Sequence, residues 1–144
     1  MPKMIFVNLP VADVGRATAF YEALGFEKNA MFSNAQASSM AWSDAIVVML
    51  LDRAFYATFT AKRIIDAHEQ SGALLALSFE DRAAVDAITL AALAAGGREL
   101  HDPEDHGFMY SRAFEDPDGH GWGPFHMDMA AAEQAMTPQQ GGSQ

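Results

Sequence analysis

Apolar and polar residues follow a similar order twice along this chain of 144 residues. Residues 6–13 (FVNLPVAD) and 74–81 (LLALSFED) are apolar segments of strand length, and each ends in an aspartate. Apolar residues at helical spacing come next, and each aspartate can accept backbone N–H groups from the first turn of such a helix. Gly25 and the pair Gly96–Gly97 then stop the two helical patterns. Each half of the chain is therefore predicted to begin with a strand and a helix.

Three further strands are expected in each half, because short apolar or alternating segments are separated by turn residues. In the first half they cover residues 26–32, 35–42 and 45–51, and in the second half residues 98–102, 107–114 and 120–127. Each half then has the order strand, helix and three strands. The modules occupy about residues 4–51 and 73–128, within a single α+β domain over residues 1–129.

Two segments lie outside this repeat. Residues 52–72 connect the modules and carry Phe55, Tyr56 and Phe59, which make the segment too apolar for a free linker. We expect this connector to fold over part of the domain. Residues 130–144 are polar and contain Gln and Gly, which predicts a disordered tail.

Composition excludes several classes of function. A formal net charge of −10 disfavours binding to nucleic acid or to an anionic membrane, and weakly favours cationic ligands. The longest apolar run, AIVVMLL, is too short to cross a membrane, and the N-terminal residues lack the apolar core of a signal peptide. The absence of cysteine excludes thiolate metal sites and fits a cytoplasmic protein.

A turn sequence lies before the last predicted strand, in residues 115–128, EDPDGHGWGPFHMD. Pro117 fixes one backbone angle, Asp118 bonds locally and Gly119 can adopt a positive φ. Together with FVNLPVADVGRATAFYEALGF, the sequence FEDPDGHGW resembles the vicinal oxygen chelate superfamily, which includes glyoxalases, bleomycin resistance proteins and extradiol dioxygenases. The resemblance covers about residues 4–128. It implies two βαβββ modules that form a curved mixed sheet around a cavity, and a homodimer.

Many members of that superfamily hold a divalent metal in the cavity through His and Glu. The resemblance places the corresponding positions at Phe6, Leu74 and Gly123, with a fourth near Met49. None of these residues offers an oxygen or nitrogen donor from its side chain to a hard cation. We therefore predict no metal and no cofactor. A glutamate in place of Gly123 would be a buried charge without a partner, whereas glycine widens the pocket.

Strand alternation and the resemblance together predict which residues contact a ligand. The predicted set is Phe6, Asn8, Met49, Leu74, Ser111, Gly123 and Phe125. Asn8 either satisfies a neighbouring backbone group or binds a carbonyl or amide of the ligand. Arg112 either pairs with an acidic residue at a sheet edge or, if the strand is shifted by one residue, binds an anion in the pocket.

The histidines offer one catalytic candidate. His106 lies beside Asp105 in the loop PEDHGF, where it could act as an acid or base at the mouth of the cavity. His68 and His101 are expected to be solvated. His120 and His126 share the strand face of Trp122, which is expected to point away from the cavity.

Two functions follow from these observations. The first is a metal-free protein that binds an aromatic or amphipathic small molecule in an apolar cavity, as in bleomycin resistance. The alternative is an enzyme of the same superfamily, a glyoxalase-type lyase or isomerase or a dioxygenase-like protein. It would use an unpredicted metal site or acid-base chemistry at His106. We favour the binding protein.

Overall fold

The computed structural model describes residues 3–136 and contains two modules of the same order. The first comprises β1 (Ile5–Val11), α1 (Val14–Ala23), β2 (Glu27–Lys28), β3 (Ala37–Ala41) and β4 (Ile46–Asp52). The second comprises β5 (Leu74–Ser78), α3 (Arg82–Ala94), β6 (Arg98–Asp105), β7 (Met109–Glu115) and β8 (Gly121–Met127). The predicted α+β fold of two βαβββ modules is confirmed.

Both helices begin at the aspartates that the repeat identified. The side chain of Asp13 accepts the N–H of Arg16, and that of Asp81 accepts the N–H of Ala84. Gly25 follows α1 with a φ of 103°, a conformation that residues with a Cβ rarely adopt. The sequence pattern therefore predicts where both helices begin, through their capping aspartates, and where α1 ends, through Gly25.

Each module forms its own four-stranded mixed sheet, in the orders β1-β4-β3-β2 and β5-β8-β7-β6. The first strand of each module is parallel to the last, and the other neighbours are antiparallel. The resemblance implied one curved sheet, but among the described residues no strand ladder joins the two sheets. Side chains of the turn before β8 bond the end of β1 instead. The Asp118 carboxylate accepts the N–H of Ala12 at 2.9 Å, and His120 Nε2 donates to the carbonyl of Pro10 at 2.7 Å.

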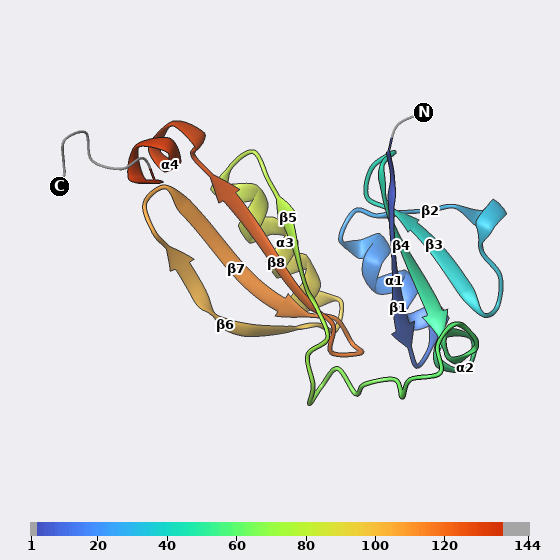
Figure 1. Cartoon of the computed structure of the whole chain (residues 1–144). Helices are drawn as coiled ribbons and strands as arrows, with labels where there is room; N and C mark the ends of the chain where they lie inside the picture. Colours follow the sequence, from blue (N-terminus) through green and yellow to red (C-terminus); the bar gives the residue numbers. More distant parts are fainter. Residues whose placement is uncertain (1–2, 137–144) are drawn as a thin grey trace.

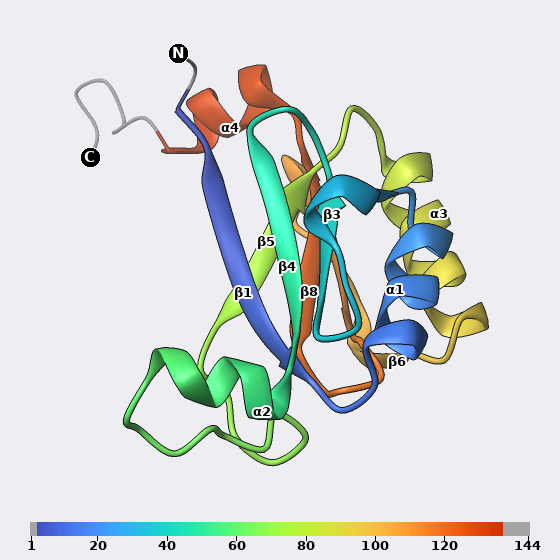
Figure 2. The ribbon, with the colours of Figure 1, turned by 90° about the vertical axis from the view of Figure 1, so that its right-hand side faces the viewer.

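Helices α1 and α3 lie on the same side of the two sheets and contact each other (Figures 1 and 2). The core lies between these helices and the sheets and is continuous across both modules. Tyr21 of α1 packs edge-on against Trp122 of β8, with ring centroids 5.8 Å apart. The opposite side of the sheets, here called the open face, carries no helix along most of its length.

The connector folds against the first module, as its aromatic residues predicted. It begins with α2 (Arg53–Tyr56) and a 3₁₀ turn, η2 (Ala57–Phe59), and then runs without regular structure to β5. Helix α2 contacts β1 and β4 at one end of the first sheet. Within residues 3–136, no helix has both the length and the apolar character needed to cross a membrane.

Two segments differ from the sequence prediction. The strand expected over residues 26–32 shortens to β2 and continues as a 3₁₀ turn, η1 (Ala30–Phe32), because the Asn29 side chain accepts the N–H of Met31. The tail predicted to be disordered begins as helix α4 (Met129–Met136). Asp128 caps this helix by accepting the N–H of Ala131, and Ala132 is buried. The rest of the tail, residues 137–144, lies outside the described residues.

Candidate functional site

On the first sheet, strand alternation separates core residues from open-face residues. Leu9 and Val11 of β1 belong to the core, so Phe6 and Asn8 face the opposite side of the sheet. Met49 of β4 lies beside Asn8 in the strand register. Phe6 is 53% exposed, which is high for a large apolar side chain in a strand. The open face of the first module is therefore apolar and accessible.

The second sheet has the same arrangement. Trp122 lies in the core, and its neighbours Gly123 and Phe125 take the positions of opposite parity. Ser111 of β7 pairs with Phe125 in the register. Leu74 of β5 is 76% exposed. A Cβ built at Gly123 would meet only the carbonyl oxygen of Arg112, at 3.8 Å, so the absence of a side chain leaves open space there.

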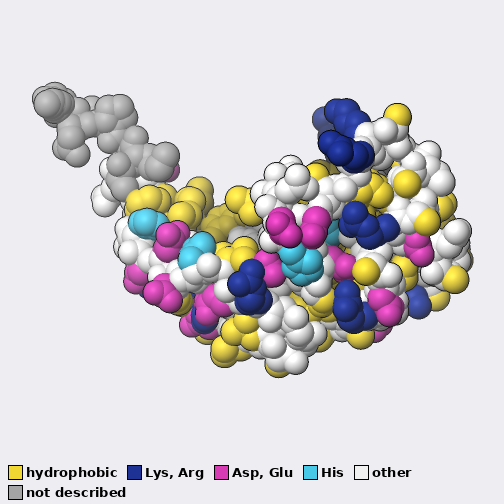
Figure 3. All heavy atoms as spheres, turned by 90° about the horizontal axis from the view of Figure 1, so that it is seen from below, with side chains coloured by type: hydrophobic (Ala, Val, Ile, Leu, Met, Phe, Trp, Pro, Cys, Tyr) yellow, Lys and Arg dark blue, Asp and Glu magenta, His cyan; other side chains and the backbone are white. Residues whose placement is uncertain are grey.

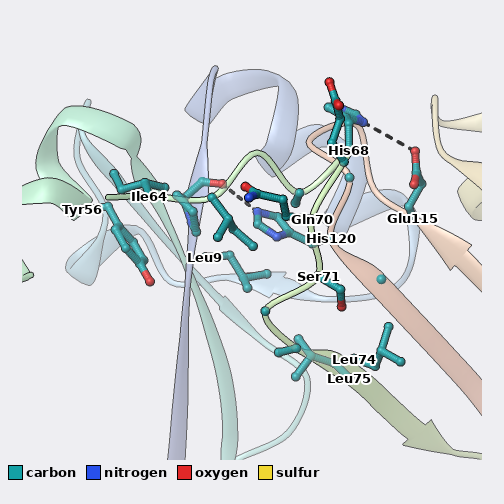
Figure 4. A pocket seen from close by; sticks show the side chains of 18 of the residues that line it. Leu9, Tyr56, Ile64, His68, Gln70, Ser71, Leu74, Leu75, Glu115 and His120 are labelled. Carbon is teal, nitrogen blue, oxygen red and sulfur yellow. Dashed lines mark hydrogen bonds and ion pairs between the residues drawn. The ribbon is translucent and has the colours of Figure 1, made fainter. Parts of the chain in front are cut away.

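A hollow of about 530 Å³ lies between β1, the connector, the turn before β8 and the start of β5, and we call it the connector hollow (Figure 4). Its size is within the usual range for small-molecule sites. Its apolar lining includes Leu9, Pro10, Ile64, Leu74, Leu75 and Leu100. Its polar lining includes Asn8, Lys62, Arg63, His68, Glu115 and His120. The mixture suits a ligand that has both an apolar body and a polar group.

A smaller hollow of about 190 Å³ adjoins it beneath α2, and we call it the aromatic hollow. It is lined by Asn8, Leu51, Tyr56, Phe59 and Thr60. Asn8, Tyr56 and Thr60 line both hollows, so the two meet at these three residues. The aromatic residues of the connector therefore form a wall of the candidate site.

The hollows contain two of the seven residues predicted to contact a ligand. Asn8 and Leu74 line the connector hollow. The other five, Phe6, Met49, Ser111, Gly123 and Phe125, line neither hollow. They lie on the open faces of the two sheets, outside the connector hollow and the aromatic hollow.

Asn8 has no hydrogen-bond partner for its side chain among the described residues. The structure therefore does not support the first interpretation of Asn8, in which its side chain forms a hydrogen bond with a neighbouring backbone group. Its amide offers a donor and an acceptor at the junction of the two hollows. This is a polar group placed toward the space that a ligand would fill.

Two contacts hold the later part of the connector over its hollow. Gly119 lies so close to the backbone of Ala67 and His68 that an added Cβ would be only 2.6 Å from it. His68 Nδ1 lies 3.6 Å from a carboxylate oxygen of Glu115 (Figure 4). Within the connector, Arg53 of α2 donates to the carbonyl of Ile65 at 3.3 Å. The outer wall of the connector hollow is thus attached to the turn before β8 and to the end of β7.

Beneath the turn, a buried polar group joins the two modules. The hydroxyl of Tyr21 donates to Asp116 at 2.6 Å and accepts from Trp122 Nε1 at 2.9 Å. Burial raises the pKa of Asp116 and raises that of Tyr21 well above its usual value. The second carboxylate oxygen of Asp118 is buried without a hydrogen-bond partner among the described residues. This polar group positions the turn, and none of Tyr21, Asp116, Asp118 and Trp122 lines the connector hollow.

Two histidines, His106 and His120, lie elsewhere than the sequence predicted. His106 lies in the exposed turn between β6 and β7 and lines neither hollow. His120, which we expected to point away from the cavity, lines the connector hollow, as does His68. Strand periodicity cannot predict the positions of His68 and His120, because His68 lies in the irregular connector and His120 lies at the turn before β8. The proximity of residues 67–68 to Gly119 depends on tertiary packing.

Arg112 takes the first of its two predicted positions. It forms ion pairs of 2.9 Å with Asp86 of α3 and with Glu99 of β6, on the helix side of the second sheet. It therefore does not point toward the open face. Among residues 3–136, no group of three or more His, Asp or Glu side chains is arranged to hold a metal ion.

Comparisons with known proteins bear on this geometry. Residues 3–36 match the family described as bleomycin resistance protein-like N-terminal. No curated protein matches the chain. Several solved structures share its fold, and the three described next are each below 25% identity.

A hypothetical protein from S. aureus is 22% identical, with a TM-score of 0.74 over 88% of this chain and 94% of its own. A glyoxalase/bleomycin resistance protein/dioxygenase family enzyme from Burkholderia phytofirmans PsJN is 18% identical, with a TM-score of 0.72 over 88% and 99%. TnmS3, an antibiotic binding protein from Streptomyces sp. CB03234, is 22% identical, with a TM-score of 0.62 over 88% and 97%. The solved structures confirm the fold that the sequence resemblance implied, and the family match agrees with that resemblance over residues 3–36.

Proposed function

We propose that this chain, which has the fold of the glyoxalase/bleomycin resistance/dioxygenase superfamily, is a metal-free small-molecule binding protein. Its ligand is an aromatic or amphipathic compound that lies in the connector hollow. The observation that carries this proposal is the side-chain amide of Asn8, which has no hydrogen-bond partner among residues 3–136 and lies where two largely apolar hollows meet. The antibiotic-binding function in the name of TnmS3 supports the same class of activity.

The proposed ligand surface includes all seven predicted residues. Asn8 and Leu74 contact the ligand within one chain, because both line the connector hollow. A second copy of the chain covers the open faces and encloses the remaining five, which are Phe6, Met49, Ser111, Gly123 and Phe125. The exposure of Phe6 and Leu74 supports this arrangement, since large apolar side chains in strands are usually covered. The cytoplasm is the compartment that fits the absence of cysteine.

A neutral aromatic probe, 2-naphthalenemethanol, tests the proposal. We expect it to shift the backbone amide signals of Gly119 and Gly121, which line the connector hollow, and not that of Gly107 in the distant β6–β7 turn. Leu74→Trp places an indole in the hollow and should abolish these shifts. Leu90→Trp puts the same ring on the exposed surface of α3, outside the hollow, so this control should retain them. Binding that is lost in the control and kept in Leu74→Trp contradicts the location of the site.

Metal addition separates the binding protein from the enzyme alternative. A metal that bound only the native state at about 100 times its dissociation constant would stabilise it by about 2.7 kcal/mol. Phe6, Leu74 and Gly123 have no donor side chains, so we expect no rise in melting temperature with Ni, Zn, Co, Mn or Fe(II). Elemental analysis of the purified protein should find no stoichiometric metal. A clear rise that disappears in His120→Ala or His106→Ala would favour an enzyme with a relocated metal site.

A further inference from the structure

Two neighbouring cations of the connector, Lys62 and Arg63, line the connector hollow. Neither forms an ion pair with any other residue between 3 and 136. Most other arginines of the chain are occupied. Arg16, Arg82, Arg98 and Arg112 pair with carboxylates, and Arg53 bonds backbone carbonyls. Of the cations without an ion pair among the described residues, Lys62 and Arg63 are the two that line the candidate site.

The charged lining of the hollow, two cations and two carboxylates, lacks the strong acidic excess of the whole chain, whose formal net charge is −10. Figure 3, which looks onto the connector side, shows Lys and Arg side chains around a group of acidic and His side chains. Two carboxylates line the hollow, Glu69 and Glu115. Glu115 is engaged by Arg98 at 3.3 Å and by His68 at 3.6 Å. Among the lining residues without an ion pair to another described residue, there are thus two cations, Lys62 and Arg63, and one carboxylate, Glu69.

Apolar side chains of β1 and β5 line the same hollow. Leu74 and Leu75 project from β5, and Leu9 lies on β1 beside His120 (Figure 4). An apolar ligand body that removes these side chains from water is stabilised by roughly 25 cal/mol per Å² of buried apolar surface. A cationic pair beside an apolar wall is the arrangement that recognises an organic acid.

We infer that the connector hollow binds an amphipathic organic anion. Its acid group lies against Lys62 and Arg63, and its aromatic or aliphatic body lies against Leu9, Leu74 and Leu75. This inference rests on the proposed binding function and specifies the ligand class. It reverses the preference for cationic ligands that the overall charge suggested, because the field at a site depends on nearby charges within about 10 Å.

Three probes with one naphthalene body test the head group. They are 2-naphthoate, 2-naphthalenemethanol and 2-naphthylmethylammonium, titrated into full-length protein at low salt while the Gly119 and Gly121 amide signals are followed. We expect 2-naphthoate to bind about tenfold more tightly than the alcohol, and the ammonium to bind more weakly than the alcohol. In Lys62→Gln/Arg63→Gln, the affinity for 2-naphthoate should fall about tenfold, with that for the alcohol within about twofold of the parent protein.

The matched control is Lys3→Gln/Lys28→Gln. It removes the same two charges from exposed residues that do not line either hollow. We expect it to change the 2-naphthoate affinity by less than about twofold. Equal loss in both double variants would mean that only net charge matters and would overturn the inference. So would a loss of alcohol binding in Lys62→Gln/Arg63→Gln, because the pair would then shape the hollow without recognising charge.

The head-group comparison also separates this inference from the proposed function. Equal binding of the acid and the alcohol at Gly119 and Gly121 overturns the anion preference and leaves the small-molecule site in place. If none of the three probes shifts these two amides, both the inference and the proposed function are contradicted.

Discussion

At the scale of single residues, the hydroxyl of Tyr21 is a buried polar group that joins the two modules. It bonds two buried groups from the second module, the Asp116 carboxylate and the Trp122 ring nitrogen. Removing this hydroxyl leaves Asp116 Oδ2 and Trp122 Nε1 without a bond among buried residues, while Asp116 Oδ1 keeps its two backbone donors. Sequence periodicity predicted the helix on which Tyr21 lies buried. It could not predict these partners, because they lie about a hundred residues away in the chain.

Replacing Tyr21 with Phe should therefore lower the free energy of unfolding by about 3 kcal/mol. Urea denaturation followed by tryptophan fluorescence would measure the loss. Tyr110→Phe is the matched control, because the Tyr110 hydroxyl bonds Asp86 at the edge of α3, where solvent reaches and Arg112 also engages the carboxylate. It should cost about 1 kcal/mol or less. Equal losses in the two variants would show that the buried group contributes no more than a surface bond.

At the scale of elements, the connector is what the sequence could not place. The strands and helices follow from alternation, and the helix starts follow from Asp13 and Asp81. The connector has no periodicity beyond η2, so its path depends on contacts with Gly119 and Glu115. Since this segment forms the wall of the hollow, the sequence predicted Asn8 and Leu74 but neither His68 nor the Lys62–Arg63 pair.

Gly119→Ala tests how the connector is held. The residue has a φ of +92°, and its added Cβ would lie 2.6 Å from the backbone of Ala67 and His68. We expect a loss of at least about 2 kcal/mol in unfolding free energy, from backbone strain and displacement of the connector. Trypsin should then cleave faster after Lys62 and Arg63 in the native protein.

Gly107→Ala provides the control for backbone strain alone. Its φ is +81°, and an added Cβ would have nothing within 4 Å. This variant should lose about 1 kcal/mol and keep the parent rate of trypsin cleavage in the connector. If both variants are cleaved at the parent rate, the close approach at Gly119 does not hold the connector in place.

At the scale of the whole molecule, the open face is left without a cover within the described chain. β1 and β5 are the inner edge strands of two separate sheets, and exposed apolar residues such as Phe6 and Leu74 lie on them. Edge strands with apolar faces are commonly covered by another chain. The resemblance implied a dimer, and this surface is the one that a second copy would cover.

Sedimentation should accordingly find a dimer at micromolar concentration. Phe6→Glu should shift the protein to monomer, because a buried carboxylate without a partner opposes association. Met31→Glu is the control, since Met31 is also a highly exposed apolar residue but lies in η1, away from β1 and β5. A parent protein that sediments as a monomer, or a dimer that Phe6→Glu leaves intact, would reject the open face as the interface.

The turn before β8 has a consequence for motif-based inference of function. Three side chains of this turn hydrogen-bond to the first module. Asp116 bonds to Tyr21, Asp118 to Ala12 and His120 to Pro10. These contacts serve folding, whatever residue occupies position 123. A genome survey that uses the motif FEDPDGHGW to identify metal-dependent enzymes would therefore include proteins that share these inter-module contacts but catalyse no common reaction. The residue that helps to assign an enzyme class is the one four positions after the glycine of DPDG, which is Gly123 in this chain.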